Sequence, residues 1–213
     1  SASVLVNSSA ARESVELSRR VDGLGVGLHL NLTEGSPLVR GHSSLVDGRG
    51  AFPGKKALWE RSTAGRLEPA ELRREIEAQW RALESLGVAP THVDGHNHAH
   101  ILPGIAEAFL DVVPPGVWVR LPGRGPPPPP GAGEETWPSD IYQSREILAA
   151  TLTGLSARAL ARGWSRYRFA DRFEGLLLRA GYGEEDLLDL LSRLPPADGG
   201  VVEIMTHPGE TCD

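Results

Sequence analysis

Residues 69–100, PAELRREIEAQWRALESLGVAPTHVDGHNHAH, combine the clearest helical pattern of the chain with a strand and a dense group of histidines. Within Pro69–Leu86, apolar side chains recur every three to four residues, which is the period of an amphipathic helix. The proline stands in the first turn and Gly87 follows the last one, as at the ends of many helices. Thr91–Asp94 then predicts a short strand. A helix that leads directly into a buried strand indicates a βαβ unit, and with it an α/β fold.

The rest of the chain repeats this alternation of strands and helices. Its apolar runs are short and continuous, which is typical of parallel strands covered on both faces. The Gly-, Pro- and Ser-rich stretch Glu34–Ala57 predicts an irregular excursion, and Gly123–Gly133 predicts a stiff polyproline spacer. Further strands are expected at Val4–Val6, Leu24–Leu32, Val117–Leu121, Ala170–Phe173 and Gly200–Thr206, and further helices at Ala11–Arg20, Pro103–Val112, Ser144–Ala161 and Glu184–Leu194.

The composition limits the class of protein. At 213 residues the chain has the length of a single domain. Its 22 Lys and Arg against 28 Asp and Glu give a net charge of −6. That balance argues against nucleic acid or a membrane surface as partner, because both attract clustered positive charge. No apolar run reaches the ~20 residues of a membrane span. The single cysteine, Cys212, excludes an internal disulfide and fits a cytoplasmic location.

The two ends of the sequence suggest a longer domain. The chain starts at Ser1 without Met, and its first seven residues, SASVLVN, predict a strand already in progress. They show no signal-peptide pattern. The last residues, His207–Asp213, follow a predicted strand without a closing helix. We therefore expect residues to be missing at both ends.

Histidines gather at three predicted strand ends. In parallel α/β folds the functional site lies at the carboxyl ends of the strands. Imidazole is the commonest metal ligand and the usual acid or base near neutral pH. A metal site is therefore expected where these strand ends meet. Six of the seven histidines lie there: His29, His92, His96, His98, His100 and His207.

The spacing of the central histidine block allows two geometries. Along a strand, His92, Asp94 and His96 would point to one face. If the chain turns helical after Asp94, His96 and His100 would stand at i and i+4, as two ligands of one metal do. In either geometry Asp94 could accept the second N–H of a ligand histidine and orient its ring.

The sequence resembles the YdjC-like carbohydrate deacetylases, the family that includes chitooligosaccharide deacetylase. The resemblance extends over nearly the whole chain in the right order. It implies a deformed, TIM-barrel-like (β/α) barrel, related to the polysaccharide deacetylase barrels, that forms one domain over residues 1–213. The matching stretches are Gly27–Gly35, Thr91–His100 with Pro103, and His207-Pro208-Gly209, with weaker matches at Leu5–Asn7, Arg120–Pro122 and Asp171–Gly175.

The resemblance also implies an activity, the hydrolysis of the acetamido group of N-acetylglucosamine-type sugars with one divalent metal ion. By position, His29 and His96 would be the two histidine ligands. The family's third ligand is an aspartate from a paired-Asp motif, and the other carboxylate of that pair is the expected general base. No Asp-Asp pair occurs in this sequence, so we expect the motif upstream of Ser1.

Other roles follow from position on the expected barrel rim. His207 would be the general acid that protonates the leaving amine. Asp94, His100 and Arg120 would support the ligands or hold the substrate. The resemblance favours Mg as the metal, while mixed imidazole and carboxylate ligands also suit Zn, Co or Mn. The resemblance further suggests a homodimer.

Two other functions stay open at this point. One is a different metallohydrolase on the same barrel, such as a phosphoesterase, although Arg120 and Arg124 are the only obvious cations for a phosphate at the rim. The other is a non-catalytic sugar-binding protein, which the missing aspartate pair would explain.

Overall fold

The computed structural model describes residues 1–122, 151–174, 184–192, 194 and 199–206. The chain divides into two compact units, residues 1–120 with 155–169, and residues 121–154 with 170–213. Three sequence predictions lie outside the described residues: the polyproline spacer Gly123–Gly133, residues 144–150 of the expected helix Ser144–Ala161, and His207. Residues 151–161 of that helix are helical.

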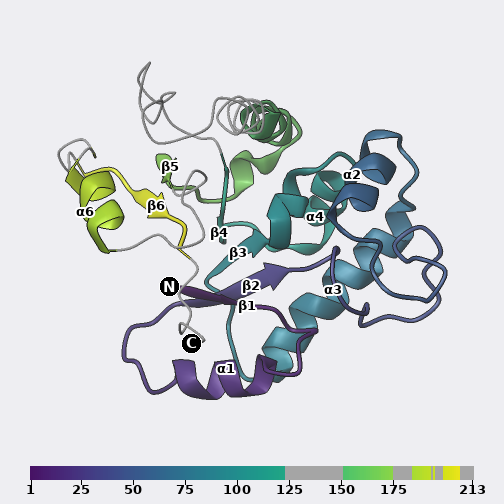
Figure 1. Ribbon diagram of the computed structural model, residues 1–213, viewed down its shortest axis with the longest axis horizontal. Helices are drawn as coiled ribbons and strands as arrows, with labels where there is room; N and C mark the ends of the chain where they lie inside the picture. Colours follow the sequence, from purple (N-terminus) through teal and green to yellow (C-terminus); the bar gives the residue numbers. More distant parts are fainter. Residues whose placement is uncertain (123–150, 175–183, 193, 195–198, 207–213) are drawn as a thin grey trace. The chain divides into compact units, whose positions relative to one another are not determined.

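The first unit is built on a sheet of four parallel strands, whose order in space is their order in the sequence (Figure 1). This arrangement confirms the predicted α/β class with parallel strands. β2 and β4 are shorter than the strands predicted there, whereas β1 and β3 have the predicted lengths at shifted positions. The strands are β1 (Ala2–Val4), β2 (Val26–Leu30), β3 (His92–Gly95) and β4 (Trp118–Val119).

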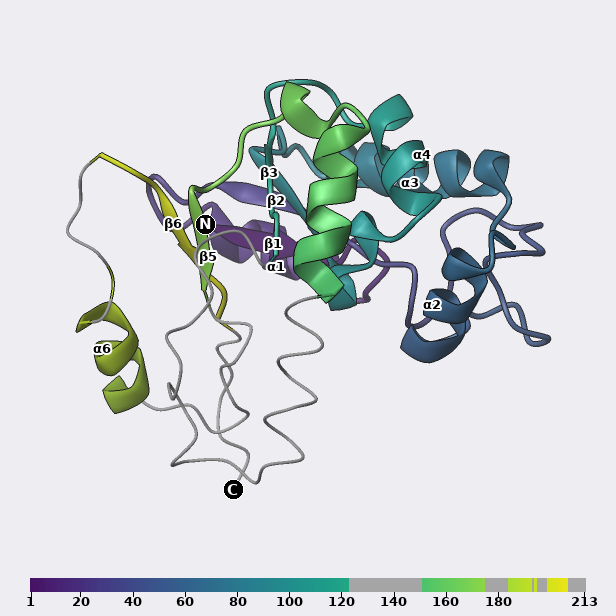
Figure 2. The same ribbon diagram turned by 90° about the horizontal axis from the view of Figure 1, so that it is seen from above.

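Helices connect the successive strands, as a parallel sheet requires. Figures 1 and 2 show α3 and α4 side by side. Gly87 ends the longest helix by adopting φ +79°, a left-handed conformation that favours glycine. The helices within residues 1–120 are α1 (Ala11–Ser18), α2 (Lys55–Thr63), α3 (Pro69–Ser85) and α4 (Ile105–Val112), with the 3₁₀ segment η1 (His96–Ile101). The remaining part of this unit adds helical residues 155–161 and the 3₁₀ segment η3 (Trp164–Arg166).

The strand expected at Val4–Val6 lies two residues earlier in the structure. Ala2 pairs with Val26, and the amide of Ala2 donates to the carbonyl of Gly25. The chain then leaves the sheet, because the amide of Ser8 closes a turn onto the carbonyl of Leu5 before α1 begins.

Two glycines let the central strands and the histidine block approach closely. A Cβ atom on Gly27 would lie 2.4 Å from the carbonyl oxygen of His92, and one on Gly95 would lie 2.5 Å from Nδ1 of His100. Neither position can take a larger residue unless backbone or ring moves. Gly27 in β2 and Gly95 at the end of β3 are therefore packing requirements of this sheet.

An irregular excursion after β2 is fastened to α3 by two buried glutamates. Glu75 accepts the backbone amides of Leu38 and Val39, both at 3.0 Å. Glu71 accepts the amides and hydroxyls of Ser43 and Ser44. These bonds replace the water that an ionised carboxylate loses on burial.

The excursion ends earlier than expected. The stretch Glu34–Ala57 was predicted irregular throughout, but α2 begins at Lys55. Its glycines and prolines end at Gly54, which has φ +86° and stands just before the helix. The following residues contain no glycine or proline and extend into a helix that the sequence reasoning missed.

The second unit contains a separate two-stranded sheet. β5 (Arg172–Glu174) pairs in parallel with β6 (Val202–Ile204), and α6 (Glu184–Ser192) lies between them in the sequence. Closure of one barrel over residues 1–213 stays a prediction. Among the described residues, no helix has both the length and the apolar character needed to cross a membrane.

The substitution Glu71→Gln should destabilise the protein by about 1–3 kcal/mol at pH 7. The NH₂ group of the glutamine would face backbone amides and hydroxyls that now donate to the carboxylate. Burial by itself would raise the pKa of Glu71, but the hydrogen bonds from Ser44 and Ser43 lower it from 4.5 to about 2. The folded-state pKa lies below the unfolded one, so the stabilisation is complete above about pH 4.5 and disappears as the pH falls toward 2.

Urea unfolding at pH 7 and at pH 4 measures this effect. The difference in the free energy of unfolding between the wild type and E71Q should be smaller at pH 4 than at pH 7. Glu77→Gln is the matched control on the same helix, since Glu77 forms an exposed pair with Arg81 that contributes at most about 1 kcal/mol. An equal and pH-independent loss of unfolding free energy in both variants would contradict the stabilising role of Glu71.

Candidate functional site

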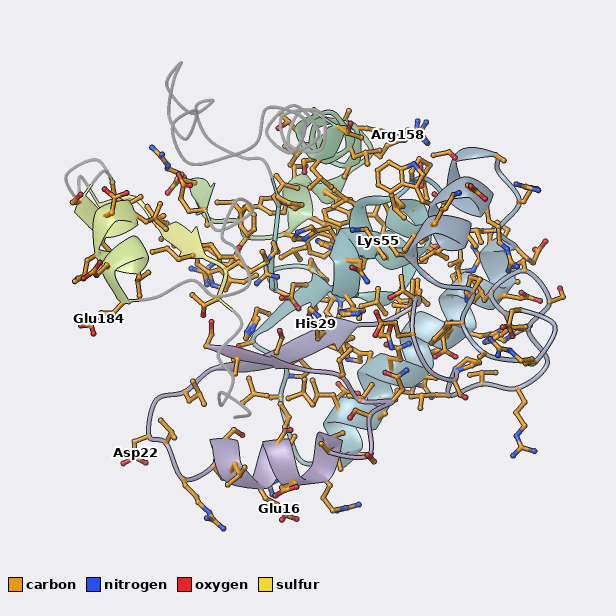
Figure 3. All side chains as sticks on the ribbon, in the orientation of Figure 1. Glu16, Asp22, His29, Lys55, Arg158 and Glu184 are labelled. Carbon is orange, nitrogen blue, oxygen red and sulfur yellow. The ribbon has the colours of Figure 1, made fainter. Side chains whose placement is uncertain are left out.

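The site starts from the register of β2 and β3. His29 and Asp94 are direct partners across these two parallel strands, and their side chains meet on the same face of the sheet. Nδ1 of His29 lies 2.7 Å from Oδ1 of Asp94. Figure 3 labels His29 on β2. The short contact fixes the imidazole ring in one orientation.

Asp94 receives partners from β1, from β2 and from the residue that follows β4. Besides His29 on β2, the hydroxyl of Ser3 on β1 donates to Oδ2 at 3.2 Å. Arg120, which follows β4, places Nη1 2.6 Å from the same oxygen. The carboxylate is thus buried but fully surrounded by donors.

The electrostatics keep Asp94 ionised. Burial alone would raise its pKa, but the hydrogen bond with His29 and the guanidinium of Arg120 together hold the pKa of this carboxyl well below its usual range. An ionised Asp94 accepts a hydrogen bond from Nδ1–H of His29. The lone pair of that imidazole is therefore on Nε2, on the other side of the ring.

His96 faces that lone pair. Its Nδ1 lies 3.3 Å from Nε2 of His29, and the two rings meet edge to face with centroids 5.3 Å apart. Its Nε2 lies 3.2 Å from Oε1 of Glu34, an ion-pair distance without a hydrogen bond. Each histidine thus has a carboxylate on its outer nitrogen and turns the other nitrogen toward its partner.

This arrangement fits a cation between the rings. Asp94 leaves the lone pair of His29 on Nε2, and Nδ1 of His96 lies within hydrogen-bond distance of that lone pair. Two imidazole nitrogens bound to a tetrahedral Zn²⁺ at 2.0–2.1 Å would lie roughly 3.3–3.4 Å apart, close to the 3.3 Å between His29 and His96. The donor set therefore fits two ligands of one divalent metal.

The pair supplies only part of a coordination shell. Within the described ranges, no group of three His, Cys, Asp or Glu side chains is placed so that it could hold a metal ion. The remaining ligands must come from other residues, water or substrate. Asp94 is not free for this role, because His29, Ser3 and Arg120 already occupy its oxygens.

The histidine block forms neither of the two regular geometries. β3 ends at Gly95, and η1 starts at His96 with Asn97 and His98 in left-handed conformations, φ +54° and +55°. Asn and His adopt this region more readily than most residues do. The side chain of Asn97 donates to Oγ1 of Thr33 at 3.2 Å and so ties the turn to the end of β2.

The left-handed turn directs His100 into the core. His100 is fully buried and stacks on Trp164 with ring centroids 5.9 Å apart. Its Nε2 donates to the carbonyl of Arg120 at 2.9 Å. Burial lowers the pKa of His100 to about 4, so the ring is neutral near pH 7. His100 therefore supports the strand end that carries Arg120.

The sequence reasoning overlooked Ser3 and Glu34 as site residues. A signal for Glu34 existed, because it lies four residues after β2 in the matching stretch Gly27–Gly35. Ser3 gave no signal, since a serine within a strand has no characteristic pattern. His207, the predicted acid, lies outside the described residues.

The chain matches the model of the YdjC-like protein family over residues 1–213. It is 36% identical over 222 residues to a carbohydrate deacetylase of Mus musculus, covering 98% of this chain and 68% of the relative. It is 40% identical over 113 residues to the chitooligosaccharide deacetylase of Serratia marcescens, covering 51% of this chain and 44% of the relative. The chain spans about two thirds of the length of the mouse and human relatives.

A solved structure shares the fold. The crystal structure of an Enterococcus faecalis V583 protein, named for cellobiose-phosphate cleavage, superposes with a TM-score of 0.66 at 20% identity, covering 99% of this chain and 70% of that one. The predicted resemblance is confirmed by the family match and by the identity to the mouse relative. The chain belongs to the YdjC-like protein family.

Proposed function

We propose that the protein is a metal-dependent carbohydrate deacetylase that hydrolyses the acetamido group of N-acetylglucosamine-type sugars or oligosaccharides. The names of its relatives in mouse and Serratia marcescens support the reaction and the substrate class. The observation that carries the proposal is the 3.3 Å approach of the inner nitrogens of His29 and His96, each with a carboxylate on its outer nitrogen.

His29 and His96 would hold one divalent metal ion. When bound, such an ion polarises the acetamido carbonyl and lowers the pKa of a water molecule toward neutrality. The resemblance to the family favours Mg²⁺, whereas two imidazole ligands suit Zn²⁺, Co²⁺ or Mn²⁺. The identity of the metal is therefore tested in the experiment below.

Asp94 acts through His29. Its low pKa makes it a poor base, and its oxygens are already hydrogen-bonded, so its role is to fix the tautomer and the ring of His29. Arg120 keeps that carboxylate charged. His207 is proposed as the acid that protonates the leaving amine, a group that otherwise leaves very slowly.

We also propose that the four strands are part of a deformed (β/α) barrel. Neighbouring strands follow one another in the sequence, β1-β2-β3-β4, with helices between them. Barrels have this sequential order, whereas doubly wound sheets reverse the strand order at a switch point.

Acetate release from N-acetylglucosamine oligomers tests the proposed activity in the full-length protein. Acetate should appear, stop when EDTA removes the metal, and return when one of Mg²⁺, Zn²⁺, Co²⁺ or Mn²⁺ is added. Phosphate release from sugar phosphates without acetate would instead indicate another metallohydrolase. Sugar binding without turnover at any metal would indicate a binding protein. Either result would overturn the proposal.

His29→Ala and His96→Ala should each lower acetate release at least ~100-fold and weaken metal binding, because each removes one ligand. Metal content by atomic emission and initial rates measure the two effects. His92→Gln, on β3 but outside the pair, is the control and should keep both. Unchanged activity in either alanine variant would contradict the assignment.

Asp94→Asn should weaken metal binding about 10- to 100-fold, because an amide can donate to Nδ1 of His29 and so move the lone pair away from Nε2. Competition with a metal-binding dye measures the affinity. Asp94→Asn leaves the charge of Arg120 uncompensated. The double variant Asp94→Asn with Arg120→Gln removes both charges and is the second protein to test. Wild-type metal affinity in both would refute this role of Asp94.

A further inference from the structure

A buried amide on α3 holds the segment that leads to the site. Gln79 has no exposed surface, although it is polar and lies among the apolar side chains of the helix. Its Oε1 accepts the backbone amide of Asn31 at 3.0 Å, and its Nε2 donates to the backbone carbonyl of Asn31 at 2.7 Å. The side chain pairs with the backbone just after β2 as a neighbouring strand would.

The orientation of this amide is fixed by a third group. Nε2 of Gln79 also donates to Oε1 of Glu75 at 2.8 Å. A carboxylate only accepts, so the NH₂ end of Gln79 must face Glu75 and the oxygen must face the amide of Asn31. The clamp on Asn31 thus has one defined arrangement.

Asn31 passes this constraint to the next turn. Its Oδ1 accepts the backbone amides of Thr33 and Glu34 at 3.0 and 3.1 Å, and its Nδ2 donates to the carbonyl of Glu34 at 2.8 Å. Bonds of this kind, from an Asn side chain to the backbone two or three residues on, define a local turn. Both backbone polar groups of Glu34 are held by one side chain.

The turn contacts the histidine block at two points. The carboxylate of Glu34 lies 3.2 Å from Nε2 of His96, and Thr33 accepts the side chain of Asn97. Without a fixed backbone, an exposed glutamate side chain would lose conformational entropy to hold this position. The buried amide of α3 removes part of that cost.

We propose that Gln79 is a positioning residue for the site: through Asn31 it fixes the turn that sets the Glu34 carboxylate against the outer nitrogen of His96. The inference deepens the proposed function, since it assumes that His96 is a ligand, and it assigns to Gln79 and Glu34 roles in orienting that ligand. A purely structural role would change stability but leave His96 and the metal affinity as they are.

Three variants separate these roles. Gln79→Met keeps the approximate volume and removes the clamp. Glu34→Gln keeps the turn and removes the charge at His96. Glu71→Gln is the matched control, because it disrupts a buried polar contact of the same helix that holds Ser43 and Ser44 and not the turn at Glu34.

The first measurement is the long-range ¹H–¹⁵N NMR spectrum of the imidazoles in the metal-free protein. Gln79→Met and Glu34→Gln should both shift the ring nitrogens of His96, and Glu71→Gln should leave them in place. Identical His96 signals in the wild type and Gln79→Met would overturn the proposal. So would an equal shift in Glu71→Gln.

The second measurement is Zn²⁺ affinity by competition in the single variants and in the double variant. Gln79→Met and Glu34→Gln should each weaken binding about 10-fold or more. If Gln79 acts through Glu34, the double variant should be little worse than Glu34→Gln alone. Multiplicative losses in the double variant would mean that Gln79 does not act through Glu34.

The two proposals fail in different ways. Acetate release by the wild type with His96 signals that do not respond to Gln79→Met would leave the deacetylase and remove the positioning role. Coupled shifts of His96 and coupled Zn²⁺ affinities without acetate release would keep the positioning role and remove the deacetylase.

Discussion

One buried carboxylate, that of Asp94, joins the four strands of the sheet. Its partners come from β1 (Ser3), β2 (His29) and the residue that follows β4 (Arg120). Removing an ionised carboxylate from water is unfavourable by several kcal/mol unless donors and an opposite charge replace the solvent. The donors come from β1, from β2 and from the residue directly after β4. The register of the sheet and the charge state of the site therefore depend on the same contacts.

The close spacing of β2 and β3 has a specific cause in the sequence. Gly27 lets β2 lie against the backbone and ring of His92, and Gly95 leaves room for the chain to fold back onto His100. A side chain at either place would push the strand or the ring away. The 2.7 Å contact of His29 with Asp94 would then lengthen, and the ring of His29 would lose its fixed orientation. The two glycines thus affect the geometry of the site through the strand spacing.

The sequence predicted the parts of the fold that depend on local patterns. The helix predicted at Pro69–Leu86 and the strand predicted at Thr91–Asp94 are both present, each within one residue of the predicted bounds. Both predictions succeeded because the apolar period and the glycine after a helix are local signals. The histidine pair was also predictable as a group, since strand ends of parallel sheets gather at one edge. Arg120 was named as a supporting residue, but Ser3 and Glu34 were missed, because they reach the site only through tertiary structure.

Buried polar residues on α3 show the same limit. Glu71, Glu75 and Gln79 look like the solvent-facing positions of an amphipathic helix, yet all three are buried. Their partners are backbone groups and side chains of residues 31–44, 27 to 48 positions away in the sequence, and no local pattern indicates such bonds. The turn of η1 escaped prediction for a similar reason, because Asn97 is held by Thr33, which lies 64 positions earlier in the sequence, after β2.

The central claim is that His29 and His96 bind one metal ion through their inner nitrogens. X-ray absorption spectroscopy of the zinc-loaded protein tests it most directly, because the scattering pattern of imidazole rings reports their number. Two imidazole nitrogens at about 2.0–2.1 Å are expected in the wild type, and one in His96→Ala. Zinc bound without imidazole, or an unchanged imidazole number in His96→Ala, would contradict the claim.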